Sequence, residues 1–200
     1  MAFTEVKLIG LTRGQELHEA YILIFEVQET QRIVPIFVDR EEFEMVEAAM
    51  QSGDYAPTGL MNRLARRLML FPQQARILRP DGGDTSAMVD YDRNGEQVSL
   101  CLTVGEAMIW ANQNHVPVVM SSDYINAFSR MADNSHAVKV PVDGMPTKLL
   151  QAAIQTAVKE DNFELPSRLL AELHKRYARR VISVHKDKRT EPAPLTPQKQ

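Results

Sequence analysis

The sequence lacks most features that would place it outside the soluble globular proteins. It contains a single cysteine, Cys101, which excludes a disulfide framework, and the apolar neighbours of Cys101 predict a buried structural thiol. No apolar run approaches the roughly 20 residues that a membrane-spanning helix needs, and the N-terminus lacks the basic start and apolar core of a signal peptide. We therefore expect a cytoplasmic protein that is not inserted in a membrane.

Motifs that define several classes of binding protein and enzyme are missing as well. The sequence contains neither a G-x-x-x-x-G-K nor a G-x-G-x-x-G loop, no cluster of cysteine and histidine ligands, and no Ser/His/Asp elbow. The formal net charge is −3, and hydrophobic residues make up 44% of the 200 residues. A chain of this length and composition can form one full-sized core and an appendage.

A β-prone run that leads directly into a helix start occurs twice. In the first copy Asp39 and Glu42, three residues apart, have the spacing of a capping box, the polar pattern of a helix N-terminus. In the second copy Thr103 and Glu106 have the same spacing. Both pairs of equivalent positions are 64 residues apart, since 103 − 39 = 64 and 106 − 42 = 64. The sequence therefore predicts a strand and a helix that are repeated in one register.

The repeat extends towards the N-terminus, because residues 21–28 match residues 85–92 at the same shift. Asn94-Gly95 lies between two β-prone runs and predicts a hairpin turn. Pro35 has no amide hydrogen to donate, so its strand is expected at an edge or a bulge. We predict an α+β fold, in which residues 1–130 form two β-β-β-α halves that share one mixed sheet. A further helix between the halves is expected to carry Met61, Leu64, Ala65 and Leu68 on its inner face.

The C-terminal part has a different sequence pattern, without the strand-and-helix repeat. Residues 131–146 are interpreted as a linker, residues 147–180 as an α-helical hairpin, and residues 181–200 as a disordered tail with few large apolar side chains. Such a hairpin has one apolar face that must be covered. The protein's own sheet domain, a second copy in a homo-oligomer or a protein partner could cover this face, and we expect one of the latter two. Its main residues are Leu150, Ile154, Leu169 and Leu173.

Part of the chain resembles the bifunctional nuclease family, which has DNase and RNase activity. The matching motifs are Val34-Pro35-Ile36-Phe37-Val38 with Glu42 in the first half, and Glu106-Ala107, Ala111 and Val116-Pro117-Val118 in the second. The resemblance implies hydrolysis of phosphodiester bonds in DNA or RNA. The family's Thr-His-Asp and Arg-Pro-Ser-Asp-Ala motifs are replaced here by residues 58–60 and 103–107. The alternative is a non-enzymatic interaction or regulatory module that keeps the fold.

The hairpin is similar to the UVR motif, through which subunits of the excision-repair nuclease contact each other. The similarity rests on Ala153, on the acidic turn at residues 160–164 and on the leucine-rich run 169–173. It implies that the hairpin binds a protein partner or another copy of the chain.

The two repeated helix starts carry the candidate catalytic residues, Glu42 and Glu106. Together with Asp39 these carboxylates could hold Mg²⁺ or Mn²⁺, which activate water for phosphodiester hydrolysis. The alternative is that Asp39, Glu42, Thr103 and Glu106 only cap two helices.

Basic residues of the second predicted helix are the candidate contacts to nucleic acid. Arg63, Arg66 and Arg67 could neutralise phosphates, or they could form an ordinary solvated helix face. His115 follows a helix and could act as an acid or base, or it could simply end the helix.

Overall fold

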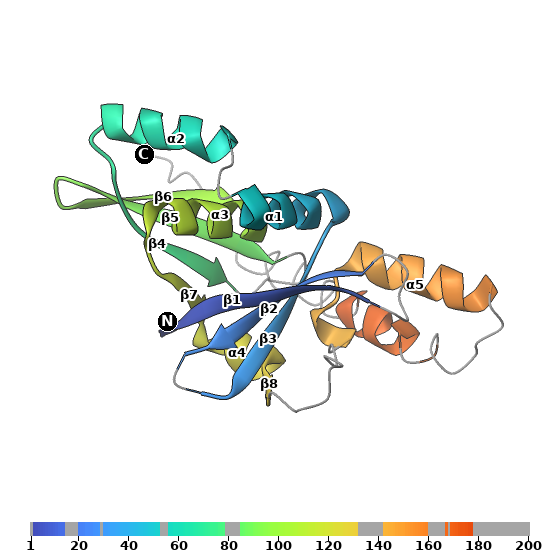
Figure 1. Cartoon of the computed structure of the whole chain (residues 1–200). Coiled ribbons are helices and arrows are strands. Elements are labelled where there is room, and N and C mark those ends of the chain that lie inside the picture. The colour runs from blue at the N-terminus through green and yellow to red at the C-terminus, as the bar shows by residue number, and fades with distance from the viewer. Residues whose placement is uncertain are drawn as a thin grey trace, which may run out of the picture. The chain divides into compact units, whose positions relative to one another are not determined.

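The computed structural model describes residues 2–14, 20–28, 30–52, 56–78, 85–131, 142–159, 167 and 169–177. The chain divides into two units, Met1–Leu149 and Leu150–Gln200. The described residues contain helices together with one mixed sheet, which confirms the predicted α+β class (Figure 1). Among them, no helix has the length and apolar character needed to cross a membrane.

The sheet of the first unit has eight strands, in the order β6-β5-β4-β7-β1-β2-β3-β8. Neighbouring strands are antiparallel except β4 and β7, whose parallel pairing joins the two halves. The strands are β1 (Phe3–Arg13), β2 (Tyr21–Val27), β3 (Arg32–Val38), β4 (Phe71–Leu78), β5 (Ser86–Arg93), β6 (Glu96–Leu102), β7 (Val118–Ser121) and β8 (Arg130–Met131).

Two three-stranded meanders have the same order in the chain and each is followed by a helix. The meander β1-β2-β3 precedes α1 (Arg40–Ser52), and β4-β5-β6 precedes α3 (Val104–Asn114). In the sheet, β1 and β4 lie on either side of β7, while β3 and β6 lie further out. A gene duplication would produce this order, and the duplication itself stays a prediction.

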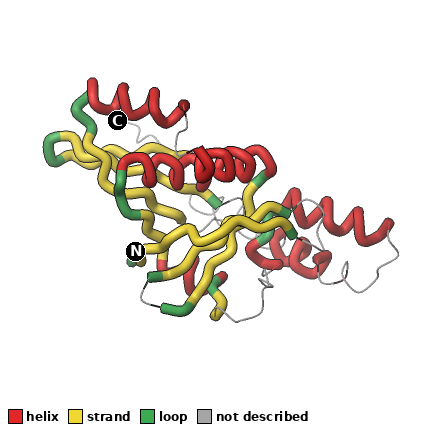
Figure 2. The backbone as a smooth tube through the Cα atoms, viewed as in Figure 1, coloured by secondary structure: helices red, strands yellow, loops and turns green. Residues whose placement is uncertain are grey.

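The core of the first unit lies between the sheet and the paired helices α1 and α3 (Figure 2). Helix α1 buries Phe43, Val46 and Ala49, which recur at helical spacing. The indole of Trp110 in α3 donates a hydrogen bond of 2.9 Å to the hydroxyl of Tyr91, and the two rings are 5.2 Å apart. The buried indole N–H is therefore satisfied without water.

Helix α2 (Ala56–Arg67) differs from the prediction in its inner face. Met69 adopts a left-handed φ of 56°, which ends the helix before Leu70. Ala65 is buried as expected, but Leu64 and Leu68 are 55% and 57% exposed, so the prediction for these two leucines was wrong. The helix packs along one narrow stripe, and the leucines lie on its flank.

Strand β6 is the outermost strand on one side of the sheet, which corrects another expectation. Cys101 belongs to this strand and is exposed, so the predicted burial of its thiol was wrong. Because β6 has a neighbouring strand on one side only, no side chains of a second strand cover the outer flank of Cys101 in the described part of the chain. Pro35 lies on β3, which pairs on its outer side with β8 only at Arg32 and Ile33, as expected for an edge position.

Two short helical segments follow β7. The first is α4 (Ser122–Phe128), in which the hydroxyl of Ser121 accepts a hydrogen bond from the amide of Tyr124. The second is a 3-10 turn, η1 (Val142–Gly144), which precedes α5 (Thr147–Lys159).

The second unit contains the rest of α5 and a further helical stretch at residues 169–177. The side chain of Gln151 donates a hydrogen bond of 3.1 Å to the hydroxyl of Tyr177, so the two stretches are in contact. The predicted hairpin turn at residues 160–164, the predicted tail at residues 181–200 and most of the predicted linker lie outside the described residues. The hairpin therefore stays a prediction.

Candidate functional site

The helix starts predicted from the sequence are both capped. The amide of Glu42 donates to the Asp39 carboxylate over 2.8 Å, and the amide of Phe43 donates to the Asp39 carbonyl over 3.1 Å. In the second half the capping box is complete, because the Glu106 amide donates to the Thr103 hydroxyl and the Thr103 amide donates to the Glu106 carboxylate. Asp39, Thr103 and Glu106 thus have the structural role that was the alternative to metal binding.

Glu42 differs from Glu106 in the use of its side chain. The Glu42 carboxylate accepts a hydrogen bond from the backbone amide of Gly105, at the start of the other helix, and one from the Thr103 hydroxyl. Glu42 therefore links the two halves of the domain, which are 63 residues apart in the chain at this point. Spare amides at a helix start and the helix dipole both favour a carboxylate there.

The two helix starts meet at Asp39, Glu42, Thr103, Gly105 and Glu106, and this contact is called the junction. Its local electrostatics favour the protonated form of Glu42. Burial raises the pKa of Glu42 above its usual value of 4.5, and the nearby carboxylates of Asp39 and Glu106 raise it further. The hydrogen bonds from Gly105 and Thr103 oppose this increase without cancelling it. Two neighbouring carboxylates thus act on Glu42 at the start of α3.

The junction does not fit a bound divalent cation. In the part of the chain that the structure describes, no group of three or more histidine, cysteine, aspartate and glutamate side chains is arranged to hold a metal ion. The carboxylates of Asp39, Glu42 and Glu106 point to backbone amides instead. We therefore derive no chemical step from Mg²⁺ or Mn²⁺ at these residues.

A second candidate site lies between α2 and the C-terminal end of α3. A cavity of about 430 Å³ is formed there by residues of both helices, and none of them is acidic. Its lining residues are Gly59, Asn62, Arg63, Arg66, Asn112, Gln113 and His115. This cavity and its lining are called the α2–α3 cleft below.

The helix ends give the α2–α3 cleft its shape. His115 ends α3 in the left-handed conformation, with φ of 53°, and its amide donates to carbonyls of the last turn. The side-chain amide of Asn114 donates to Asn62 over 3.0 Å and to the Trp110 carbonyl over 2.8 Å. The Asn114–Asn62 bond connects the two helices beside the cleft. The left-handed φ of His115 and the hydrogen bonds of its amide support the interpretation of His115 as a helix-end residue.

Two of the three arginines predicted as nucleic-acid contacts line this cleft. Arg63 and Arg66 lie in it, whereas Arg67 is exposed and is not part of the lining. Asn112 and Gln113 were not predicted, although Gly59, Asn62, Arg63 and Arg66 have the i, i+3, i+4 spacing of one helix face. That spacing is the signal that could have identified the α2 side of the cleft.

The predicted catalytic and nucleic-acid-binding residues do not form one site. Glu42 and Glu106 lie at the N-terminal end of α3, whereas the α2–α3 cleft is at its C-terminal end. Helix α3 has 11 residues, and at about 1.5 Å per residue its ends are roughly 15 Å apart. A phosphate bound by Arg63 and Arg66 would therefore be far from the carboxylates.

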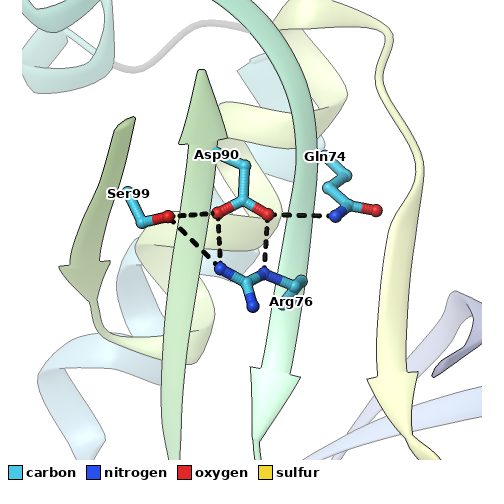
Figure 3. A network of polar contacts seen from close by, with 4 residues as sticks. All are labelled: Gln74, Arg76, Asp90 and Ser99. Carbon is cyan, nitrogen blue, oxygen red and sulfur yellow. Dashed lines mark hydrogen bonds and ion pairs between the residues drawn. The ribbon is translucent and has the colours of Figure 1, made fainter. Parts of the chain in front are cut away.

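A third cluster of polar side chains was not predicted at all. Asp90 on β5 is 1% exposed and forms an ion pair with Arg76 on β4, with 2.6 Å between Oδ2 and Nε (Figure 3). Asp90 also accepts hydrogen bonds from Ser99, over 2.7 Å, and from Gln74, over 3.0 Å. Burial alone would raise the pKa of Asp90, but these hydrogen bonds outweigh it and hold the pKa below 3.8. The cluster joins β4, β5 and β6.

The predicted partner-binding residues of the second unit are partly covered. Leu150 and Leu169 are fully buried, and Ile154 and Leu173 are half-buried. Side chains that remain exposed in the described helical stretches include Val158 and Leu170. The apolar face predicted for the hairpin is therefore only partly exposed in the described residues.

The chain matches no protein-family model, and it matches no curated protein. The resemblance to the bifunctional nuclease family and to the UVR motif accordingly stays an expectation, and the function is inferred from the geometry.

Proposed function

We propose that this protein binds single-stranded nucleic acid in the α2–α3 cleft, as a binding module that does not itself cleave the strand. The observation that carries the proposal is the convergence of Arg63 and Arg66 with Asn112, Gln113 and His115 on one cavity without an acidic lining residue. Guanidinium groups suit phosphate because they offer several N–H donors in a fixed plane.

The other lining side chains suit the remaining parts of a nucleotide. The amides of Asn112 and Gln113 can both donate and accept hydrogen bonds, as base edges and sugar hydroxyls require, and His115 offers a ring that can stack on a base. A volume of about 430 Å³ lies within the usual range of ligand pockets. A single strand can present one nucleotide to such a cleft, whereas a duplex keeps its bases stacked inside.

Phosphodiester hydrolysis is the second candidate function, and one observation favours it. The pKa of Glu42 is raised by burial and by two neighbouring carboxylates, and an acid with a raised pKa suits general acid–base catalysis near neutral pH. The same carboxylate accepts a hydrogen bond from the Gly105 amide, which favours a structural role for Glu42. The distance of this junction from the arginines of the cleft makes binding the better supported function.

Association through the second unit belongs to the non-enzymatic interpretation. We infer that a protein partner would contact the exposed side chains of the described helical stretches, such as Val158 and Leu170, because Leu150 and Leu169 are already buried. Replacing an exposed leucine by lysine, Leu170→Lys, tests this without opening the core.

Fluorescence anisotropy of labelled oligonucleotides tests the binding proposal. We expect the wild type to bind single-stranded DNA or RNA more tightly than the matching duplex, and Arg63→Ala with Arg66→Ala to weaken binding at least tenfold. Arg67→Ala is the matched control, because it removes a charge of the same helix that does not line the cleft. Equal losses in both variants would contradict the assignment of the cleft.

Incubation of the same oligonucleotides with Mg²⁺ or Mn²⁺ tests the second candidate. Cleavage that disappears in Glu42→Gln with Glu106→Gln, while anisotropy is unchanged, would establish hydrolysis at the junction. No cleavage by the wild type would leave binding as the function.

A further inference from the structure

The two edges of the sheet are built differently. Near β3, the edge carries Pro35 and is partly covered by the short strand β8. Proline, short strands and bulges are the usual devices that prevent another strand from adding to an edge. Strand β6 has none of them: it has seven residues, contains no proline or lysine, and pairs with β5 in one unbroken register. Within the described residues, no strand pairs with the outer side of β6.

The side chains of β6 also favour association. Residues 97–102, Gln-Val-Ser-Leu-Cys-Leu, carry no charge, and Leu100 is 41% exposed. Val98 and Leu100 pair with Tyr91 and Val89 of the core, so they lie on the helix-covered side of the sheet. They extend the apolar layer of the core to its open edge.

Strand β6 is held firmly in place for such a contact. Ser99, at its centre, donates a hydrogen bond to the buried Asp90 and accepts one from Arg76, which anchors β6 to the two strands behind it (Figure 3). A preformed edge loses little conformational entropy when another strand adds to it.

We propose that two copies of this chain associate through antiparallel pairing of their β6 strands, with the twofold axis at Ser99. The two sheets then become one continuous sheet, and the backbone groups along the outer side of β6 gain hydrogen-bond partners.

The sequence of β6 is complementary to itself in this register. Val98 lies opposite Leu100 of the partner subunit, and the two apolar side chains cover each other on the helix-covered side. Gln97 lies opposite Cys101 of the partner subunit on the other side. Glu96, the strand's one charged residue, lies opposite Leu102 of the partner subunit, so no like charges face each other. A second copy therefore fits this edge without repulsion.

Disulfide cross-linking tests the register. In Gln97→Cys, the new thiol lies opposite the native Cys101 of the other copy, and we expect a covalent dimer after mild oxidation. An intrachain bond is excluded, because positions 97 and 101 are four residue steps apart in one strand, which is about 13 Å. Wild type and Gln97→Cys with Cys101→Ser should not cross-link, since like positions lie far apart in this register. Glu96→Cys places its thiol on the opposite side and is the matched control.

Cross-linking of Glu96→Cys as efficient as that of Gln97→Cys would overturn the proposed pairing. Light scattering provides a second test with the full chain. We expect the wild type to have the mass of a dimer and Leu100→Lys that of a monomer, with an unchanged circular dichroism spectrum. Leu64→Lys, at an exposed leucine of α2 outside β6, should remain a dimer. A wild type that is monomeric at its highest soluble concentration overturns the proposal, whatever the variants do.

Discussion

Gly105 is where the two helix starts come closest together. A Cβ atom at this position would lie 2.7 Å from Cγ of Glu42 and 2.8 Å from Cγ2 of Val46. We expect Gly105→Ala to lower the free energy of unfolding by about 1–3 kcal/mol, because α1 and α3 must separate to admit the methyl group. Urea unfolding followed by tryptophan fluorescence measures this.

Gly59→Ala is the control, because a Cβ there has no heavy atom within 4 Å and helix α2 would gain helix propensity. Equal stability of Gly105→Ala and the wild type would show that the junction is looser than the contacts indicate.

The raised pKa of Glu42 gives the stability a dependence on pH. A folded-state pKa above the usual 4.5 means that ionisation of Glu42 is less favourable in the folded than in the unfolded protein. Its favourable contribution is complete below the unfolded pKa and decreases as the pH rises through the folded pKa. Glu42→Gln cannot ionise, and its amide oxygen can still accept the Gly105 hydrogen bond.

Relative to the wild type, the free energy of unfolding of Glu42→Gln should therefore increase as the pH rises from the unfolded-state pKa through the higher folded-state pKa of Glu42. Urea unfolding at several pH values measures the difference. Glu41→Gln, which removes an exposed carboxylate in the same helix turn, controls for net charge. A difference that does not change with pH would mean that Glu42 is not buried as described.

Asp90 has the opposite linkage. Its pKa is held below 3.8 despite burial, so its contribution to stability is present above the usual pKa and is lost as the pH falls through the folded pKa. At neutral pH, Asp90→Asn should lower the free energy of unfolding by about 3 kcal/mol, because Arg76 loses a buried ionic partner. Thermal unfolding measures the loss. Asp123→Asn, at an exposed carboxylate of α4, should change it little.

At the scale of elements, the capping side chains of Asp39 and Thr103 decide where α1 and α3 begin. Thr103→Ala removes the hydroxyl that accepts a hydrogen bond from the Glu106 amide. We expect it to lower the free energy of unfolding by about 1 kcal/mol. Thr103→Ser keeps the hydroxyl and should preserve most of the stability. Thermal unfolding of both variants distinguishes the cap from simple loss of side-chain packing. A similar loss in the serine variant would contradict the capping role.

Helix α2 shows how one element can serve two surfaces. Ala65 is buried, the leucines at positions 60, 64 and 68 are exposed on one flank, and Arg63 and Arg66 line the cleft. The apolar spacing in the sequence suggested that Leu64 and Leu68 would be covered. The helix instead packs on the core through Ala65 and the partly buried Met61, and it bonds to α3 through Asn62 and Asn114. Periodicity identified the helix and did not identify its orientation.

At the scale of the whole molecule, the net charge of −3 opposes any polyanion, so nucleic-acid binding must depend on a few local cations. This prediction rests on the proposed function. With two phosphate contacts, from Arg63 and Arg66, the logarithm of the association constant should fall with the logarithm of the salt concentration with a slope of about −1.4. Anisotropy titrations at several salt concentrations measure the slope. Arg63→Ala should halve it, and Arg67→Ala should leave it unchanged.

The sequence by itself determined the α+β class and the two helix starts, including the complete capping box of Thr103 and Glu106. These features are local, because a cap needs only two residues three positions apart, and a short run of apolar, β-prone residues predicts a strand. Arg63 and Arg66, which the sequence proposed together with Arg67 as contacts to nucleic acid, line the α2–α3 cleft, and their binding role stays a prediction.

Only the tertiary structure decided the features that depend on strand order and helix packing. The carboxylate of Glu42 accepts a hydrogen bond from Gly105 instead of closing its own capping box, and Asp90 on β5 forms an ion pair with Arg76 on the neighbouring strand β4. Cys101 is exposed because β6 lies at the edge of the sheet. These contacts join residues that are far apart in the chain, and local sequence patterns do not specify which strands become neighbours or which face a helix presents.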